Sequence, residues 1–170
     1  MDARTQRDES FWVRVRAWEL GDQLSVGEVL PSQAIRVTGT VEPFHAPTRE
    51  RISQADGPLV DPDAVEYVVT GSVVTATDYQ SDTGSGPRHA GTDVVLSVNG
   101  DLMQSQIAGP ASGIDIGSAL TVRGRLSHIG DYEWDAFGLV DTRRAWAIEE
   151  VHRLPDDDLM LRLRPAASLA

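Results

Sequence analysis

The chain has 170 residues, 41% of them hydrophobic, and a net charge of -11. It contains no cysteine, which excludes disulfides, cysteine-based metal sites and cysteine nucleophiles. No apolar run is long enough to cross a membrane, and the polar N-terminus has no signal-type segment, so a cytoplasmic protein without membrane contact is expected.

All 15 basic residues are arginine, against 26 acidic residues. A GC-rich genome and a salt-loving cell would each favour such a lysine-free, acidic chain, and the expected source is a halophile or an actinobacterium. The charge repels nucleic acid at ordinary salt concentration. In molar salt that repulsion is screened beyond about 3 Å.

The apolar residues alternate with a period of two, which predicts strands. Residues 1–10 are expected to be a disordered N-terminus. The first strand, Phe11–Leu20, would place Trp12, Arg14, Arg16 and Trp18 together on one face. Further strands are predicted at Ile35–Glu42, Val65–Thr77, Val94–Val98, Leu102–Ile107, Leu120–Ile129, Tyr132–Leu139 and Ala145–Val151.

The remaining segments favour loops. The best helical candidate is short, Pro47–Gln54, with Pro47 suited to a first turn. Predicted loops are His45–Asp63, Ser81–Thr92 and Ala108–Gly117. A single domain is expected over residues 11–152, followed by an acidic, proline-containing tail at 153–170.

Four segments read Val-x-Gly-x-Val/Leu, around Gly39, Gly71, Gly100 and Gly124. Their unequal spacing argues against a repeat protein. In three of them the glycine shares the inner face with its apolar neighbours, where it permits sharp coiling of a strand. Asn99-Gly100 instead predicts a tight hairpin turn between two strands.

These coiled strands predict an all-β protein, a small closed or partly open β-barrel with an additional N-terminal strand and long loops. Within residues 34–151, "GSALTVRGRLSHIGDYEWDAFGLVD" resembles the end of an OB-fold, and "AIRVTGTVEPF" resembles its first strand. The resemblance implies that "VEYVVTGSVV" (Val65–Val74) and "TDVVLSVNGDL" (Thr92–Leu102) form strands two and three. A β-sandwich or another small barrel is the alternative.

The sequence shows no enzyme motif, and a non-enzymatic protein without cofactor or metal is expected. The Asp-Thr-Gly-Ser at Asp82–Ser85 occurs once, in a polar loop, whereas aspartic proteases need two carboxylates sharing a proton. The four histidines have no metal-ligand spacing, and His128 is interpreted as a hydrogen-bonded core residue. The acidic clusters match no calcium loop.

Aromatic and arginine side chains give the best indication of a binding surface, predicted to comprise Trp12, Arg14, Arg16, Trp18, Arg123, Arg125 and Trp134. Tryptophan and arginine dominate protein interfaces, so the first hypothesis is a binding or assembly module for a protein partner or a second copy. The alternatives are a single-stranded nucleic-acid-binding protein that stacks bases on aromatic rings, and a barrel that binds a small ligand or acts as an enzyme. A further interpretation is that the tryptophans only close the core.

Overall fold

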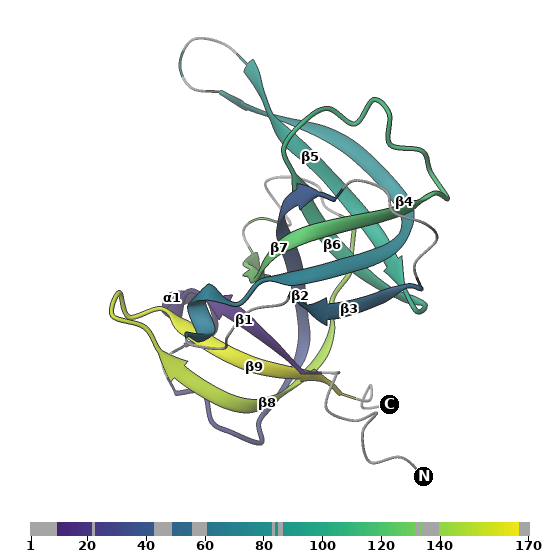
Figure 1. Ribbon diagram of the computed structural model, residues 1–170. Coiled ribbons are helices and arrows are strands. Elements are labelled where there is room, and N and C mark those ends of the chain that lie inside the picture. The colour runs from purple at the N-terminus through teal and green to yellow at the C-terminus, as the bar shows by residue number, and fades with distance from the viewer. Residues whose placement is uncertain are drawn as a thin grey trace. The chain divides into compact units, whose positions relative to one another are not determined.

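The chain forms an all-β, barrel-like fold, as its alternating pattern predicts. The computed structural model describes residues 10–21, 23–42, 49–55, 61–82, 84, 87–131, 133 and 140–166 (Figure 1). The described elements are β1 (Phe11–Val15), α1 (Ala17–Leu20), β2 (Val29–Val41), β3 (Arg51–Gln54), the 3-10 helix η1 (Pro62–Ala64), β4 (Tyr67–Asp82), β5 (Pro87–Val98), β6 (Asp101–Ile107), β7 (Ala119–Ile129), β8 (Arg144–Arg153) and β9 (Leu159–Pro165).

The strands form one sheet in the order β3-β4-β5-β6-β2-β7-β1-β9-β8, with additional pairings β4–β7 and β2–β8. By their contacts the residues divide into two compact units. Unit 1 draws on Met1–Ile35, Gly57–Val65 and Leu126–Ala170, and unit 2 on Arg36–Asp56 and Glu66–Arg125. Because β2 and β7 contribute to both units, the single domain expected over residues 11–152 stays a prediction.

Unit 2 contains a closed path of strands. β4, β5 and β6 pair antiparallel in succession, and β6 pairs parallel with β2 through Val37 and Ser105. β2 neighbours β7, which returns to β4 in an antiparallel pair. Residues on β5 are buried in succession, Val94, Val95 and Leu96, which is typical of a strand covered on both faces.

Unit 1 is organised around the chain ends. β1 pairs antiparallel with β9, and parallel with β7 through Val13 and Leu126. β9 pairs with β8, and β8 pairs with the first part of β2. Alternate residues of β1 are buried, as the period-two pattern predicts.

The predicted helix at Pro47–Gln54 is wrong where the structure describes it. Arg51–Gln54 is strand β3, paired with β4 from Arg51 opposite Thr70 to Gln54 opposite Tyr67. A helix of this length is only marginally stable alone, whereas the edge of β4 supplies backbone partners at once. Pro47 lies outside the described residues.

Two other predicted boundaries differ from the structure. Much of the predicted loop Ser81–Thr92 is strand, because β4 continues to Asp82 and β5 begins at Pro87. The predicted tail contains β9, whose Leu159, Leu161 and Leu163 are at most 2% exposed. These leucines alternate, and the short acidic run before them is a turn rather than the start of a tail. The predicted strand Tyr132–Leu139 lies almost wholly outside the described residues.

Two of the strand glycines lie where β2 and β7 come closest. A Cβ atom on Gly39 would lie 1.9 Å from the carbonyl oxygen of Arg123, and one on Gly124 would lie 2.0 Å from that of Thr38. At Gly71 a Cβ would lie 2.7 Å from the carbonyl oxygen of Ser97. Glycine is required at these positions because neighbouring backbone already occupies the space of a side chain.

Gly100 has the separate role that its sequence predicts. Asn99 and Gly100 have φ angles of 53° and 89°, and the flanking Val98 and Asp101 are paired. Two consecutive positive φ values are typical of the type I′ hairpin turn. The predicted turn at Asn99-Gly100 is therefore confirmed, whereas the three strand glycines, predicted to permit sharp coiling, lie where neighbouring backbone comes close.

Candidate functional site

β1 places Trp12 and Arg14 on the side of the strand opposite its buried residues. Both side chains are half-buried, while Phe11, Val13 and Val15 are buried. Trp12 lies opposite Arg162 of β9 in the strand register. The predicted alternation is therefore correct over β1.

The prediction that one strand face continues to Trp18 is wrong. The strand ends at Val15, Arg16 precedes α1, and the backbone N–H of Glu19 donates to the carbonyl oxygen of Arg16 at 3.0 Å. Gly21 ends the turn with a φ of 84°. Sequence alternation cannot detect a single helical turn directly after a strand. A turn of four residues is too short to distinguish a helical period of 3.6 from a strand period of two.

Trp18 is the most exposed large hydrophobic residue in the described part of the chain, at 68%. The guanidinium carbon of Arg16 lies 6.0 Å from the centre of the Trp18 ring, at the outer limit of a cation–π contact. Arg16 itself is exposed. We call these two residues, with the turn that carries them, the α1 surface.

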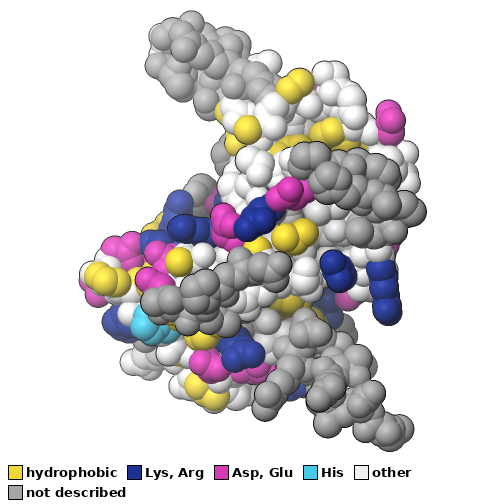
Figure 2. Space-filling view, viewed as in Figure 1, with side chains coloured by type: hydrophobic (Ala, Val, Ile, Leu, Met, Phe, Trp, Pro, Cys, Tyr) yellow, Lys and Arg dark blue, Asp and Glu magenta, His cyan; other side chains and the backbone are white. Residues whose placement is uncertain are grey.

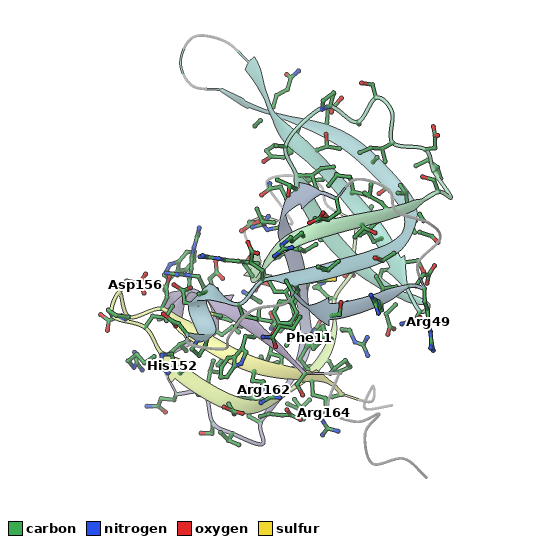
Figure 3. The ribbon with its side chains drawn as sticks, viewed as in Figure 1. Phe11, Arg49, His152, Asp156, Arg162 and Arg164 are labelled. Atoms are coloured by element: carbon green, nitrogen blue, oxygen red, sulfur yellow. The ribbon has the colours of Figure 1, made fainter. Side chains whose placement is uncertain are left out.

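Arg14 is surrounded by carboxylates of unit 1. Its Nη1 lies 2.9 Å from Oδ1 of Asp63, and its Nη2 contacts Asp156 and lies 3.1 Å from Oδ2 of Asp158. Asp63 belongs to η1, and the other two aspartates to the turn between β8 and β9, where Figure 3 labels Asp156. Arg14 thus ties three segments together, and its charge is already compensated.

A buried polar cluster lies beside α1. Nδ1 of His128 is 2.8 Å from Oε2 of Glu19, and Nε2 is 2.6 Å from Oε1 of Gln33. The side chains of His128 and Glu19 are each 4% exposed. The interpretation of His128 as a hydrogen-bonded core residue is confirmed. Its partners could not be predicted, because Glu19 is 109 residues away in the sequence.

Gln33 is also fixed through its backbone. Its carbonyl oxygen accepts a hydrogen bond from Nε1 of Trp146 at 3.0 Å, and the guanidinium of Arg144 lies 5.2 Å from the centre of that ring. Trp146 is buried. Trp146 therefore packs in the core, which is what the interpretation that the tryptophans only close the core predicts for all four.

The other predicted binding residues lie in unit 2 or outside the described residues. Arg123 and Arg125 of β7 are exposed, alternating with buried neighbours. Nε of Arg123 lies 3.1 Å from Oε2 of Glu66, and its Nη1 lies 3.9 Å from Oε1 of Glu42. Trp134 lies outside the described residues, so no common surface of all seven residues is established.

Both arginines of β9 also pair with acidic side chains. Nη1 of Arg162 is 2.9 Å from Oε1 of Glu150, and Nε of Arg164 is 3.1 Å from Oε1 of Glu149. Figure 3 shows both arginines on β9. On the face of the molecule drawn in Figure 2, several basic side chains, in blue, lie beside acidic side chains, in magenta. Much of the positive charge in this acidic chain is thus neutralised locally.

Among the residues that the structure describes, no group of three or more acidic or histidine side chains is arranged to hold a metal ion. Within the same residues, no helix is both long and apolar enough to cross a membrane. Thr83 and Ser85 of the Asp-Thr-Gly-Ser segment, like His45, lie outside the described part. Comparisons with protein families, with curated proteins and with solved structures find nothing that matches this chain.

Proposed function

We propose that this protein is a non-enzymatic binding module that engages a protein partner through the α1 surface. The exposure of Trp18 carries this proposal. Leaving a large aromatic ring in water forgoes the stabilisation of burial, and such rings are enriched where a partner covers them. Arg16, directly beside Trp18, belongs to the other residue type that dominates interface energetics.

The charge of the chain indicates the kind of partner. Two copies that each carry -11 repel one another at low salt, which disfavours self-association. A partner with an excess of basic residues would instead be attracted and oriented before contact. We therefore favour a basic protein over a second copy of this chain.

The alternative function, binding of single-stranded nucleic acid, has less support. It needs arginines whose charge is available to phosphate groups. Arg14 contacts three aspartates and Arg123 contacts two glutamates, so each would have to release these partners first. Binding of labelled oligo-dT, followed by fluorescence anisotropy across a salt series, tests this alternative; binding that weakens with salt would favour it over our proposal.

A cavity for a small ligand also has little support from the glycines. Inward-facing glycines would leave space for a ligand if nothing else filled it, but at Gly39, Gly71 and Gly124 backbone of a neighbouring strand occupies that space. A ligand-binding barrel or an enzyme would need its space elsewhere.

We further propose that unit 2 is an OB-like ring with a changed chain order. An OB-fold is a five-stranded Greek-key barrel. The meander β4, β5 and β6, closed by β7 and by one parallel strand, fits that description, but β2 precedes the meander instead of following it. Nuclear Overhauser effects between Val37 and Ser105 should be present; their absence would contradict the parallel pair on which the proposal depends.

A photo-crosslinker at position 18 tests the protein-binding proposal. In cells that express the protein, it should capture a partner, whose affinity is then measured with purified components. Trp18→Ala should weaken binding about tenfold or more, as expected for an interface hot spot. Val140→Ala removes another exposed apolar side chain of unit 1 (42% exposed) and should leave affinity unchanged.

Equal affinities for the wild type and Trp18→Ala would exclude the α1 surface as the binding site. Light scattering coupled to size-exclusion chromatography tests the second-copy alternative. If the wild type is a dimer and Trp18→Ala is a monomer, the α1 surface binds a second copy of this chain and not a basic partner.

A further inference from the structure

The α1 turn is too short to be stable as an isolated helix. It is four residues long, has no side-chain cap at its start, and none of its residues is buried as a whole. Helices of this length are not stable without tertiary contacts. Trp18 therefore keeps its position only because something else fixes the turn.

The side chain of Glu19 provides that attachment. Although it belongs to an exposed turn, its side chain is only 4% exposed and reaches His128 of β7 at 2.8 Å. Its other oxygen, Oε1, lies 3.9 Å from Nη1 of Arg16. A carboxylate this deeply buried is unfavourable unless a charged or hydrogen-bonding partner compensates it.

Both ring nitrogens of His128 have hydrogen-bonding partners. Its two ring nitrogens face two oxygen atoms, Oε2 of Glu19 and Oε1 of Gln33. Neutral imidazole donates from one nitrogen only, whereas imidazolium donates from both. The arrangement therefore fits a positively charged His128 between a carboxylate and an amide oxygen.

From this geometry we propose that Glu19 and His128 form a proton-dependent latch that holds α1 and sets the position of Trp18. Loss of the proton leaves a ring nitrogen facing an oxygen, unless the Gln33 amide turns to donate from its nitrogen. Glu19 then keeps Arg16 as its charged neighbour but loses the opposite charge on His128. Arg144 also lies near the cluster, over the Trp146 ring that donates to the Gln33 backbone.

As a means of regulation, the latch rests on the proposed function, since Trp18 is the residue that would meet the partner. The position of α1 itself does not depend on any partner. An experiment on the isolated full-length chain therefore tests the latch separately from binding.

The experiment uses the protein labelled with 5-fluorotryptophan and followed by fluorine NMR. The Trp18 resonance is assigned from Trp18→Phe, and the pH is varied from about 5 to about 9, the range in which histidine titrates. The Trp18 resonance should shift with one midpoint, equal to the midpoint of the His128 ring signals. Glu19→Gln, which keeps the shape of the side chain, should abolish this shift.

His152→Gln is the matched control, because His152 is an exposed histidine on β8 of the same unit (Figure 3). It should leave the titration of Trp18 unchanged. Hydrogen exchange of the amides of residues 16–21 should become several times faster in Glu19→Gln and in His128→Gln. If Glu19→Gln does not fold, the hydrogen exchange of His128→Gln and the wild-type titration of Trp18 test the latch.

A Trp18 resonance that does not move with pH in the wild type would overturn the latch. So would a titration that persists in Glu19→Gln or disappears in His152→Gln. If the latch behaves as expected but Trp18→Ala does not weaken partner binding, the proposed function fails and the latch remains.

Discussion

Gly39 and Gly124 allow β2 and β7 to approach closely because neither residue has a side chain. An alanine at either position would place its Cβ atom about 2 Å from a backbone carbonyl oxygen of the facing strand. Backbone cannot rotate away as a long side chain can, so the two strands themselves would have to separate.

We expect Gly124→Ala to destabilise the protein by more than the roughly 1–3 kcal/mol typical of overpacking a core. Thr40→Ala, at an exposed position of β2, should change the unfolding free energy by less than about 0.5 kcal/mol. Urea denaturation measures both. A Gly124→Ala protein as stable as the wild type would show that β2 and β7 do not approach this closely.

Asp141 gives a pH dependence at the level of one residue. Hydrogen bonds from the side chain and the backbone N–H of Arg143 lower its pKa from 3.8 to about 2. Its stabilisation is therefore complete above pH 3.8 and is lost as the pH falls towards 2. Since the side chain is 62% exposed, solvent screens the pair and the contribution is about 0–1 kcal/mol.

Asp141→Asn should accordingly be slightly less stable than the wild type at neutral pH, with a difference that shrinks as the pH falls below 3.8. Denaturation midpoints of both proteins over an acid series measure this. A difference that grows on acidification would contradict the assignment.

Residue-level patterns predicted some features of the chain and not others. The Asn99-Gly100 turn and the inward His128 follow from local rules, because turn geometry and alternation involve neighbours in sequence. Glu19 and Gln33 carry no such signal, because only the folded sheet brings them to His128. The same holds for Arg14, whose pattern indicated a binding residue but whose three aspartates come from distant turns.

At the level of elements, Arg14 joins β1, η1 and the turn between β8 and β9. Arg14→Met keeps the apolar stem but leaves three aspartates facing one another without a cation. We expect a loss of about 1 kcal/mol at low salt, and a smaller loss at high salt where like charges are screened. Thermal unfolding at two salt concentrations measures this. A loss that does not depend on salt would indicate that packing, not charge, is what Arg14 contributes.

β9 is one of the elements that the sequence pattern missed. β9 buries Leu159, Met160, Leu161 and Leu163. Each buried side chain of this size contributes about 1.5–3 kcal/mol, so together they rival the 5–15 kcal/mol stability of a typical domain. A chain ending at Arg153 should therefore lose cooperative unfolding in circular dichroism, whereas a chain ending at Ala166 should keep it.

For the whole molecule, the charge of -11 produces a general repulsion between surface groups. Salt screens this repulsion, with a Debye length of about 10 Å at 0.1 M and about 3 Å at 1 M. We expect the melting temperature to rise steadily with KCl concentration. A melting temperature that falls with KCl would mean that the local ion pairs, rather than the excess of acidic groups, dominate the electrostatic free energy.

The pairing of β1 with β9 also has a consequence for synthesis on the ribosome. Phe11 lies opposite Leu163, so one of the two strands that flank β1 is translated long after β1 itself. Every strand of unit 2 lies before Leu126 and leaves the exit tunnel earlier. Unit 2 can therefore pair its strands early in translation, while Phe11, Val13 and Val15 must wait until β9 has been translated. Premature termination before Leu159 would yield a product that lacks β9 and leaves one edge of β1 exposed and prone to aggregation.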